Sequence, residues 1–263
     1  MNPILLTPLD LTIAASLLAI DAVISLALGL GLHQRIVVAA VRMVVQLVAI
    51  GFILRKVFQL ANPAVTGLII LIMVVIAARE AAARPEKRLK HAAGFWIGLG
   101  SISSATLLTA LFALTTALRP HPWYDARYAV PLAGILLGNI LNATSLALDS
   151  FLGSISREKA GIEARLCLGA GFWEAIGPHV REAIRRGLVP LVNQMSAAGV
   201  VTLPGIMTGQ ILAGLDPIEA VKYQILLMFL LSGGSALAAV GAAYLAAWRL
   251  TDARERLRLD RLA

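Results

Sequence analysis

Seven long stretches of apolar residues dominate this 263-residue sequence and limit the folds it can adopt. They run over Leu9–Leu32, Ile36–Val57, Pro63–Ala78, Ala92–Leu118, Ala129–Leu148, Pro190–Ala213 and Lys222–Trp248. A helix needs about 20 mostly apolar residues to cross a bilayer, and all seven meet or approach that length, the third being the shortest. Apolar residues make up 59% of the chain and charged residues 14%, against about 45–50% and 25% in soluble domains. The sequence therefore predicts an all-α polytopic membrane protein, with residues 1–263 forming one transmembrane domain of about seven helices.

The 23 Lys and Arg residues are distributed unevenly between the loops. With seven spans, 17 of them fall on one side of the membrane, 5 fall on the other, and Arg42 lies within a span. Because basic loops stay in the cytoplasm, this bias predicts a cytoplasmic C-terminus and an external N-terminus in a multi-pass protein of the inner (plasma) membrane. No Lys or Arg precedes Arg35, so we interpret the first stretch as a retained span. Residues 249–263 then form a basic cytoplasmic tail, and the net charge of +8 reflects topology rather than a nucleic-acid partner.

The segment between the fifth and sixth spans, residues 149–189, is the one long loop and mixes charged with apolar residues. Its apolar residues recur every three or four positions, at Ile162, Leu166, Phe172, Trp173, Ile176, Val180 and Ile184. This spacing predicts two short amphipathic helices, broken near Gly169–Gly171 and again at Gly177–Pro178. A cytoplasmic insert of this kind either lies on the membrane surface or docks a partner protein, and the pattern leaves both interpretations open.

Residues that bind nucleotides or catalyse reactions form no recognisable group in this sequence. A P-loop requires a glycine before its lysine, and none of the five lysines follows a glycine. The four histidines form no i, i+4 pair, and the single cysteine, Cys167, excludes a multi-cysteine metal site. We therefore expect a non-enzymatic transport subunit that binds no cofactor itself, and the residues leave any metal ligands unidentified.

Polar side chains within the predicted spans are the better functional candidates, because they are costly in lipid and usually face a bundle interior or a pathway. Arg42 and Gln46 lie four residues apart, on one face of the second span. Asn139 and Asn142 lie on neighbouring faces of the fifth span. Each pair has a structural alternative: Arg42 could extend to the membrane interface, and the asparagines could join packed helices by hydrogen bonds. We keep all four as candidates for a substrate pathway.

The sixth span is the most unusual, because Pro204 and Gly205 interrupt it near the middle. Proline removes a backbone donor and glycine loosens the helix, so this pair predicts a break. The break is flanked by polar and thioether side chains, namely Asn193, Gln194, Met207, Thr208 and Gln210. Transporters use freed carbonyls beside such groups to hold a substrate near the middle of the membrane. We predict that these five residues line the pathway and that Pro204–Gly205 forms its gate.

The start of the last span carries a local helix signature. Asp216 suits the N-cap position, Pro217 suits the first helical residue, and Glu219 lies three residues after the cap. We interpret these residues as structural and expect the helix to begin at Pro217.

Three stretches resemble the permease family of the bacterial iron-export ABC transporter, to which plant aluminium-tolerance permeases also belong. They are Val41–Leu47, Leu137–Asn142 and the run Leu203–Gly214, which reads LPGIMTGQILAG. The similarity covers nearly the whole chain. It implies a separate cytoplasmic ABC ATPase in two copies, a homodimer of this chain, and ATP and Mg bound by the partner subunit. It also implies that the cargo is iron, moved outward.

The long loop resembles the coupling loop of import-type ABC permeases, whose pattern is Glu-Ala-Ala-x-x-x-Gly. Glu163, Ala164, Arg165 and Gly169 follow that spacing, with Arg165 in place of the second alanine. A downstream Ile-x-Leu-Pro element departs from the family pattern, since Leu188-Val189-Pro190 lies about eight residues late. The resemblance implies that Glu163–Gly169 docks the ATPase.

Other functional classes remain open at this point. The cargo could be an organic molecule such as a nucleotide sugar, or the chain could be a secondary transporter or a channel. Inverted repeats would favour a secondary transporter, but seven spans do not divide into two equal halves. A membrane-embedded enzyme would need an acid–base or metal cluster, which the sequence does not show.

Overall fold

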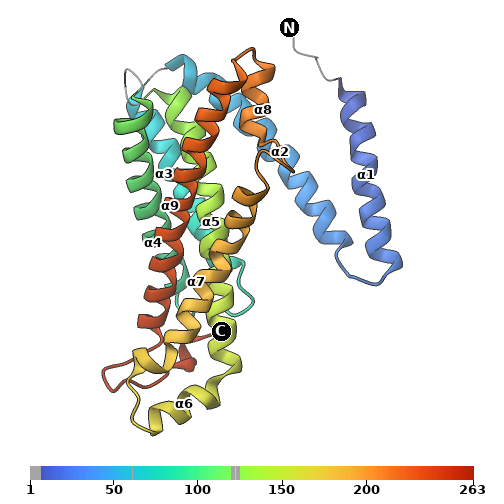
Figure 1. The fold of residues 1–263 in the computed structure, drawn as a ribbon. Coiled ribbons are helices and arrows are strands. Elements are labelled where there is room, and N and C mark those ends of the chain that lie inside the picture. The colour runs from blue at the N-terminus through green and yellow to red at the C-terminus, as the bar shows by residue number, and fades with distance from the viewer. Residues whose placement is uncertain (1–6, 61, 120–121, 123–124) are drawn as a thin grey trace. The chain divides into compact units, whose positions relative to one another are not determined.

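A computed structural model describes residues 7–60, 62–119, 122 and 125–263, and these residues form helices joined by short loops (Figure 1). The helices in chain order are α1 (Pro8–Ala27), α2 (His33–Leu60), α3 (Pro63–Ala83), α4 (Ala93–Phe112), α5 (Ala126–Arg157), α6 (Lys159–Cys167), α7 (Phe172–Ala197), α8 (Gly205–Leu212) and α9 (Pro217–Arg249). A π-helical segment, Ala113–Leu118, continues α4, and a 3-10 turn, Leu259–Arg261, lies near the C-terminus. The chain divides into two compact units: residues 1–61 with 212–214, and residues 62–211 with 215–263.

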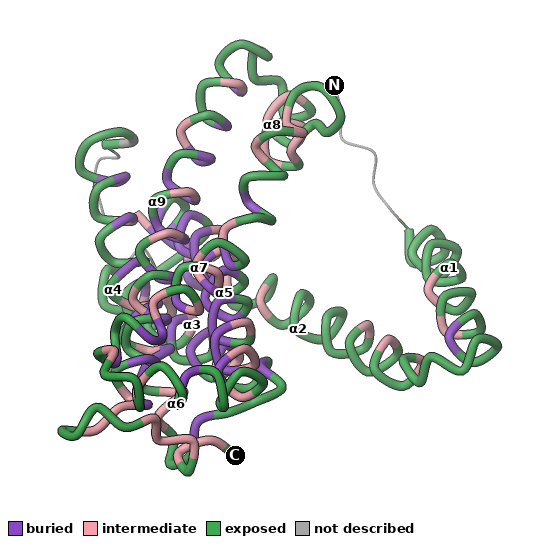
Figure 2. The backbone as a smooth tube through the Cα atoms, turned by 60° about the horizontal axis from the view of Figure 1, so that its bottom comes forward, coloured by how far each residue is buried: buried purple, intermediate pink, exposed green. Residues whose placement is uncertain are grey.

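The first unit is built on the hairpin of α1 and α2. Thr7 and Asp10 cap the start of α1 reciprocally, and the Asp10 carboxylate accepts from the Thr7 backbone N–H at 2.8 Å. The turn between the helices uses Gly29 and Gly31 in the left-handed region. The Ser25 hydroxyl accepts from the Leu32 backbone N–H at 2.9 Å. Most residues of both helices are exposed although they are apolar (Figure 2), which is typical of lipid-facing helices rather than of a water-facing surface.

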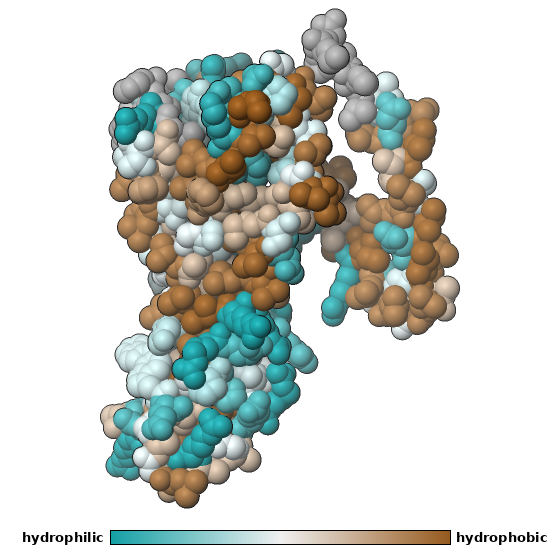
Figure 3. All heavy atoms as spheres, in the orientation of Figure 1, coloured by the Kyte–Doolittle hydropathy of each residue, from teal (hydrophilic) through white to brown (hydrophobic). Residues whose placement is uncertain are grey.

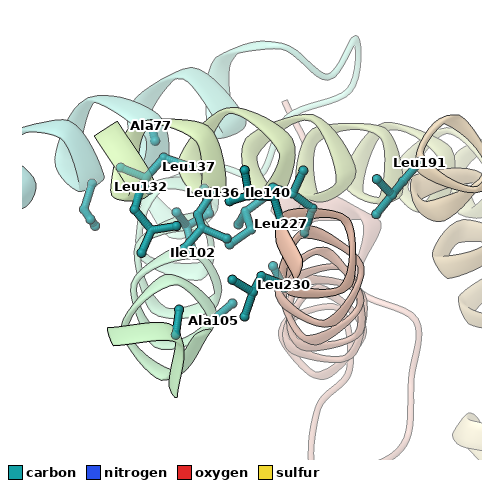
Figure 4. Packing of buried hydrophobic residues seen from close by; sticks show 14 of the residues in the cluster. Ala77, Ile102, Ala105, Leu132, Leu136, Leu137, Ile140, Leu191, Leu227 and Leu230 are labelled. Atoms are coloured by element: carbon teal, nitrogen blue, oxygen red, sulfur yellow. The ribbon is translucent and has the colours of Figure 1, made fainter. Parts of the chain in front are cut away.

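The second unit is a helical bundle organised around α5, which packs against α3, α4, α7 and α9. The core contains Ile102 from α4, Leu136 and Ile140 from α5, and Leu230 from α9 (Figure 4). Small residues bring the backbones close together, as at Gly187 of α7, which lies against α5.

Six helices among the described residues are long and apolar enough to cross a membrane: α1, α2, α3, α4 with its π-helical extension, α5 and α9. They correspond to six of the seven predicted spans. Several continue further than predicted, with α3 ending at Ala83 and α5 at Arg157. The predicted N-cap of the last span is confirmed, because the Asp216 carboxylate accepts from the Ile218 backbone N–H at 2.9 Å.

The predicted sixth span, Pro190–Ala213, is not one helix. Its first part is the end of α7, its second part is α8, and residues 198–204 between them are irregular. In Figure 1, α7 begins near the end of the bundle that holds the chain's C-terminus, whereas α8 lies at the opposite end, where α9 starts. Together α7 and α8 therefore traverse the bundle as a broken helix.

The long insert also differs from the prediction. The break near Gly169–Gly171 is present between α6 and α7, but α7 runs unbroken through Gly177 and Pro178. The helix tolerates this proline because its neighbours are held by packing: Ile176 and Val180 are buried in a cluster with residues of α5 and α9. Residues 149–189 therefore comprise the end of α5, the short α6 and the first two thirds of α7.

Three basic segments meet at one end of the second unit. The Lys90 backbone N–H donates to the Arg261 carbonyl at 2.8 Å, and the Glu86 backbone N–H donates to the Asp149 carboxylate at 2.9 Å. Figure 3 shows many hydrophilic residues at this lower end of the bundle, below a largely apolar band. The loop 84–92, the α6–α7 region and the tail thus share one end, as the span count predicts. The basic tail is folded onto that end.

Candidate functional site

The break between α7 and α8 covers residues 198–204 and so includes Pro204 of the predicted Pro204–Gly205 gate. Gly199 adopts a φ of 85°, and the backbone N–H groups of Val201 and Thr202 donate to the Ala197 carbonyl at 2.9 and 3.0 Å. Pro204 ends the break and Gly205 begins α8. Proline is compatible with the start of α8, because the first turn of a helix leaves its backbone N–H groups unbonded. Proline also disfavours a helical conformation in the residue before it, here Leu203. The irregular segment therefore ends at the predicted Pro204–Gly205 pair and extends several residues upstream of it.

Polar side chains flank this break on both sides. Asn193 and Gln194, in the last turns of α7, are exposed. Met207, Thr208 and Gln210 on α8 are half-buried. The Thr208 hydroxyl donates to the Pro204 carbonyl at 3.2 Å. The structure thus brings these five predicted residues to the two ends of one irregular segment.

Gln210 has a feature that the sequence does not reveal. Its side-chain oxygen Oε1 is shielded from solvent and accepts no hydrogen bond from the described residues. Leaving such an oxygen unsatisfied costs about 1–3 kcal/mol. A cation or a hydrogen-bond donor placed beside it would satisfy it.

The two asparagines of α5 have different partners. The Asn139 Nδ2 group donates to the Ile135 carbonyl of its own helix at 3.1 Å. The Asn142 side-chain oxygen accepts from Arg84 Nη1 at 2.7 Å, which links α5 to the end of α3. Asn139 is half-buried and Asn142 is exposed. Asn142 therefore holds Arg84 against α5.

Arg42 and Gln46 lie on α2, in the first unit, and both are exposed on its surface. The other candidate pathway residues belong to the second unit. A shared pathway for the two sets stays a prediction.

Metal-binding side chains do not cluster in the part of the chain that the structure describes. No group of three or more His, Cys, Asp or Glu residues is placed to hold an ion there. The donors around the α7–α8 break are amide oxygens, a hydroxyl and a thioether, all neutral.

The predicted docking residues lie in an exposed segment, residues 163–171, which we call the docking turn. Glu163, Ala164 and Arg165 lie on α6, and Gly169 ends that helix with a φ of 91°. The Ala164 carbonyl accepts from the Leu168 backbone N–H at 3.0 Å, and this is a usual helix end at a left-handed glycine. Leu168 is 88% exposed, so the tip of the turn presents an apolar side chain to its surroundings.

A groove of about 600 Å³ lies between this turn and the C-terminal tail. Glu163, Leu166 and Gly169 line one side, and residues 254–257 line the other. Sequence reasoning missed the contribution of the tail. The signal was the spacing of Leu257, Leu259 and Leu262, whose side chains pack against the buried cluster of the bundle end.

Comparisons with known proteins agree with this architecture. The profile of the uncharacterised protein family UPF0014 matches residues 8–250. A UPF0014 membrane protein of Synechocystis is 42% identical over 204 residues, which cover 77% of this chain and 78% of that protein. The probable iron export permease protein FetB of Escherichia coli is 30% identical over 264 residues, covering 100% and 99%. The protein ALUMINUM SENSITIVE 3 of Arabidopsis thaliana is 30% identical, covering 85% and 80%.

No solved structure matches the chain at a significant level. The family match extends over most of the chain, and the full-length similarity to FetB agrees with the resemblance found in the sequence. The chain belongs to the UPF0014 family of membrane proteins.

Proposed function

We propose that this chain is the membrane-spanning permease of an ABC transporter that exports iron and is driven by a separate ATP-binding subunit. The observation that carries the proposal is the end-to-end similarity to a protein named a probable iron export permease. The working unit would be a homodimer with two copies of the ATPase, which would bind ATP and Mg.

The geometry of α7 supports this proposal. The helix has 26 residues and is therefore about 39 Å long. One end adjoins the docking turn at Phe172, and the other reaches the break at Ala198. Because α7 lies along α5 and is unbroken, a displacement of the turn by the ATPase would move the pathway end of the same rigid helix. Residues 198–204 would then be the gate.

The side chains beside the gate suit a cargo that must be released again. Asn193, Gln194, Thr208 and Gln210 offer neutral oxygen ligands, and Met207 offers a softer thioether. Conduction requires binding that is favourable enough for entry and weak enough for exit. Neutral ligands, some contributed by each copy of a homodimer, would bind iron more weakly than a cluster of carboxylates.

The proposal is tested by purifying the chain with its cognate ATP-binding subunit in nanodiscs and measuring ATP hydrolysis. We expect a stable complex whose ATPase rate rises with Fe²⁺ and does not rise with a nucleotide sugar such as UDP-glucose. A complex stimulated by UDP-glucose and not by iron would contradict the cargo. The absence of any complex would contradict the permease assignment.

A further inference from the structure

Residues 251–263, which we call the C-terminal strap, are organised around Asp252. The Asp252 carboxylate accepts from the backbone N–H groups of Arg254 and Arg256 at 3.0 and 3.1 Å. It also accepts from Arg256 Nη2 at 2.7 Å. The Arg256 guanidinium, with these backbone donors, holds the pKa of Asp252 well below its usual range. The strap therefore has hydrogen bonds of its own in addition to its contacts with the bundle.

The strap is attached to α9 and to the loop between α3 and α4. The Arg261 Nη1 group donates to the Arg249 and Thr251 carbonyls at 2.6 and 2.9 Å, which closes the strap back onto the end of α9. The Ala263 backbone N–H donates to the Arg88 carbonyl at 2.7 Å. The strap thus connects the last helix to the loop 84–92.

The third attachment is to the start of α7, and Glu255 makes it. The Glu255 Oε2 atom accepts from the Phe172 backbone N–H at 2.9 Å. The N-cap residue of α7 is Gly171, which has no side chain to accept from the free N–H groups of the first turn. A carboxylate at this point also interacts favourably with the positive end of the helix dipole. Glu255 therefore supplies, from 83 residues away, the cap that the local sequence lacks.

The backbone of Glu255 is in an uncommon conformation where it makes this contact. Glu255 adopts a φ of 54°, which non-glycine residues rarely use. Leu257 on the same segment packs beside the cluster that contains the buried Phe172 and Ile162. Polar and apolar contacts together fix the strap against both helices that flank the docking turn.

We propose that Glu255 is a positioning residue, through which the C-terminal strap ties the docking turn 163–171 to α9 and to the loop 84–92. A displacement of the turn then reaches α9 and α4 through the strap, in addition to the α7–α8 break through α7. This inference rests on the proposed function only in that the turn receives the ATPase. The attachment itself belongs to the permease alone.

The attachment can be tested without the ATPase, because Cys167 is the only cysteine of the chain and is exposed at the end of α6, within the turn. A spin label on Cys167 in nanodiscs reports how firmly the turn is held. Loss of a helix cap predicts that Glu255→Ala increases the mobile fraction of the label about fivefold. Glu255→Gln keeps an acceptor oxygen and should restore most of the immobile fraction.

Glu86→Ala is the matched control, since it removes an exposed carboxylate at the same end of the bundle and leaves the backbone bond from Glu86 to Asp149 in place. The label should be as immobile in this variant as in the unmodified sequence. Equal mobility in Glu255→Ala and the unmodified chain would overturn the inference. A Glu255→Gln variant as mobile as Glu255→Ala would also overturn it, because the hydrogen bond would not be the cause.

A second measurement follows transport per ATP hydrolysed in proteoliposomes with the ATPase. Glu255→Ala should still bind the ATPase and hydrolyse ATP, but should transport several-fold less cargo per ATP, and Glu255→Gln should recover that ratio. An unchanged ratio in Glu255→Ala would contradict the role of the strap. Failure of the unmodified chain to bind an ATPase would contradict the proposed function and leave the Cys167 result standing.

Discussion

The substitution Gly187→Ala tests whether α7 is packed closely on α5. A methyl group at this position would lie 2.7 Å from the Ala143 carbonyl oxygen and 3.2 Å from Ala147 Cβ. Ordinary contacts of these kinds are about 3.3–4.0 Å long, so Gly187→Ala would force the two helices apart by about 0.5 Å. Because the obstructing atom is a helical carbonyl that cannot rotate away, we expect the overpacking cost to approach the upper part of the range of about 1–3 kcal/mol.

Gly233→Ala is the control, because it makes the same change inside another helix of the bundle, α9. Its methyl group would meet no neighbouring atom of the described residues within 4 Å. Both variants gain about 1 kcal/mol of helix propensity, so the difference between them isolates the overpacking, about 2–3 kcal/mol. At about 2–4 °C per kcal/mol, Gly187→Ala should melt roughly 5–10 °C below Gly233→Ala, followed by tryptophan fluorescence in nanodiscs. Equal melting temperatures would refute the close packing of α7 on α5.

Four further predictions follow from the site. Gln210→Leu should lower transport yet raise the melting temperature, because it removes a buried oxygen that has no hydrogen-bond partner among the described residues; a fall in both transport and melting temperature would contradict this. Asn142→Leu should reduce iron efflux while ATPase binding, followed by co-purification, stays intact. Gly169→Ala should weaken ATPase binding, because alanine at a φ of 91° costs about 1–2 kcal/mol. The Arg258 guanidinium lowers the pKa of Asp260 to about 2, so this pair should keep its contribution to strap stability above pH 4 and lose it towards pH 2, measured by Cys167 label mobility.

Local chemistry made several elements predictable. The start of α9 follows from Asp216, Pro217 and Glu219 because a cap depends on residues within one turn of each other. The end of α6 at Gly169 follows from a glycine that permits a left-handed conformation. The long apolar stretches specify membrane helices because length and composition are sufficient for that purpose.

Tertiary contacts explain what the sequence could not predict. The continuity of α7 through Pro178 depends on the burial of Ile176 and Val180 against helices far away in the chain. The break includes the predicted Pro204 but begins several residues earlier, because α7 ends at Ala197 in a turn that contains Gly199 with a φ of 85°. The cap on Phe172 comes from Glu255, and no local pattern can reveal a partner 83 residues away.

The central claim is tested most directly by iron transport in proteoliposomes that contain this chain and its ATP-binding subunit. We predict that Fe²⁺ crosses the membrane only while ATP is hydrolysed, and that Gln210→Leu abolishes most of this movement while the complex stays assembled. Iron movement that is independent of ATP and of the partner subunit would indicate a channel or a secondary transporter. That result, or ATP hydrolysis by an assembled complex with no iron movement, would contradict the account.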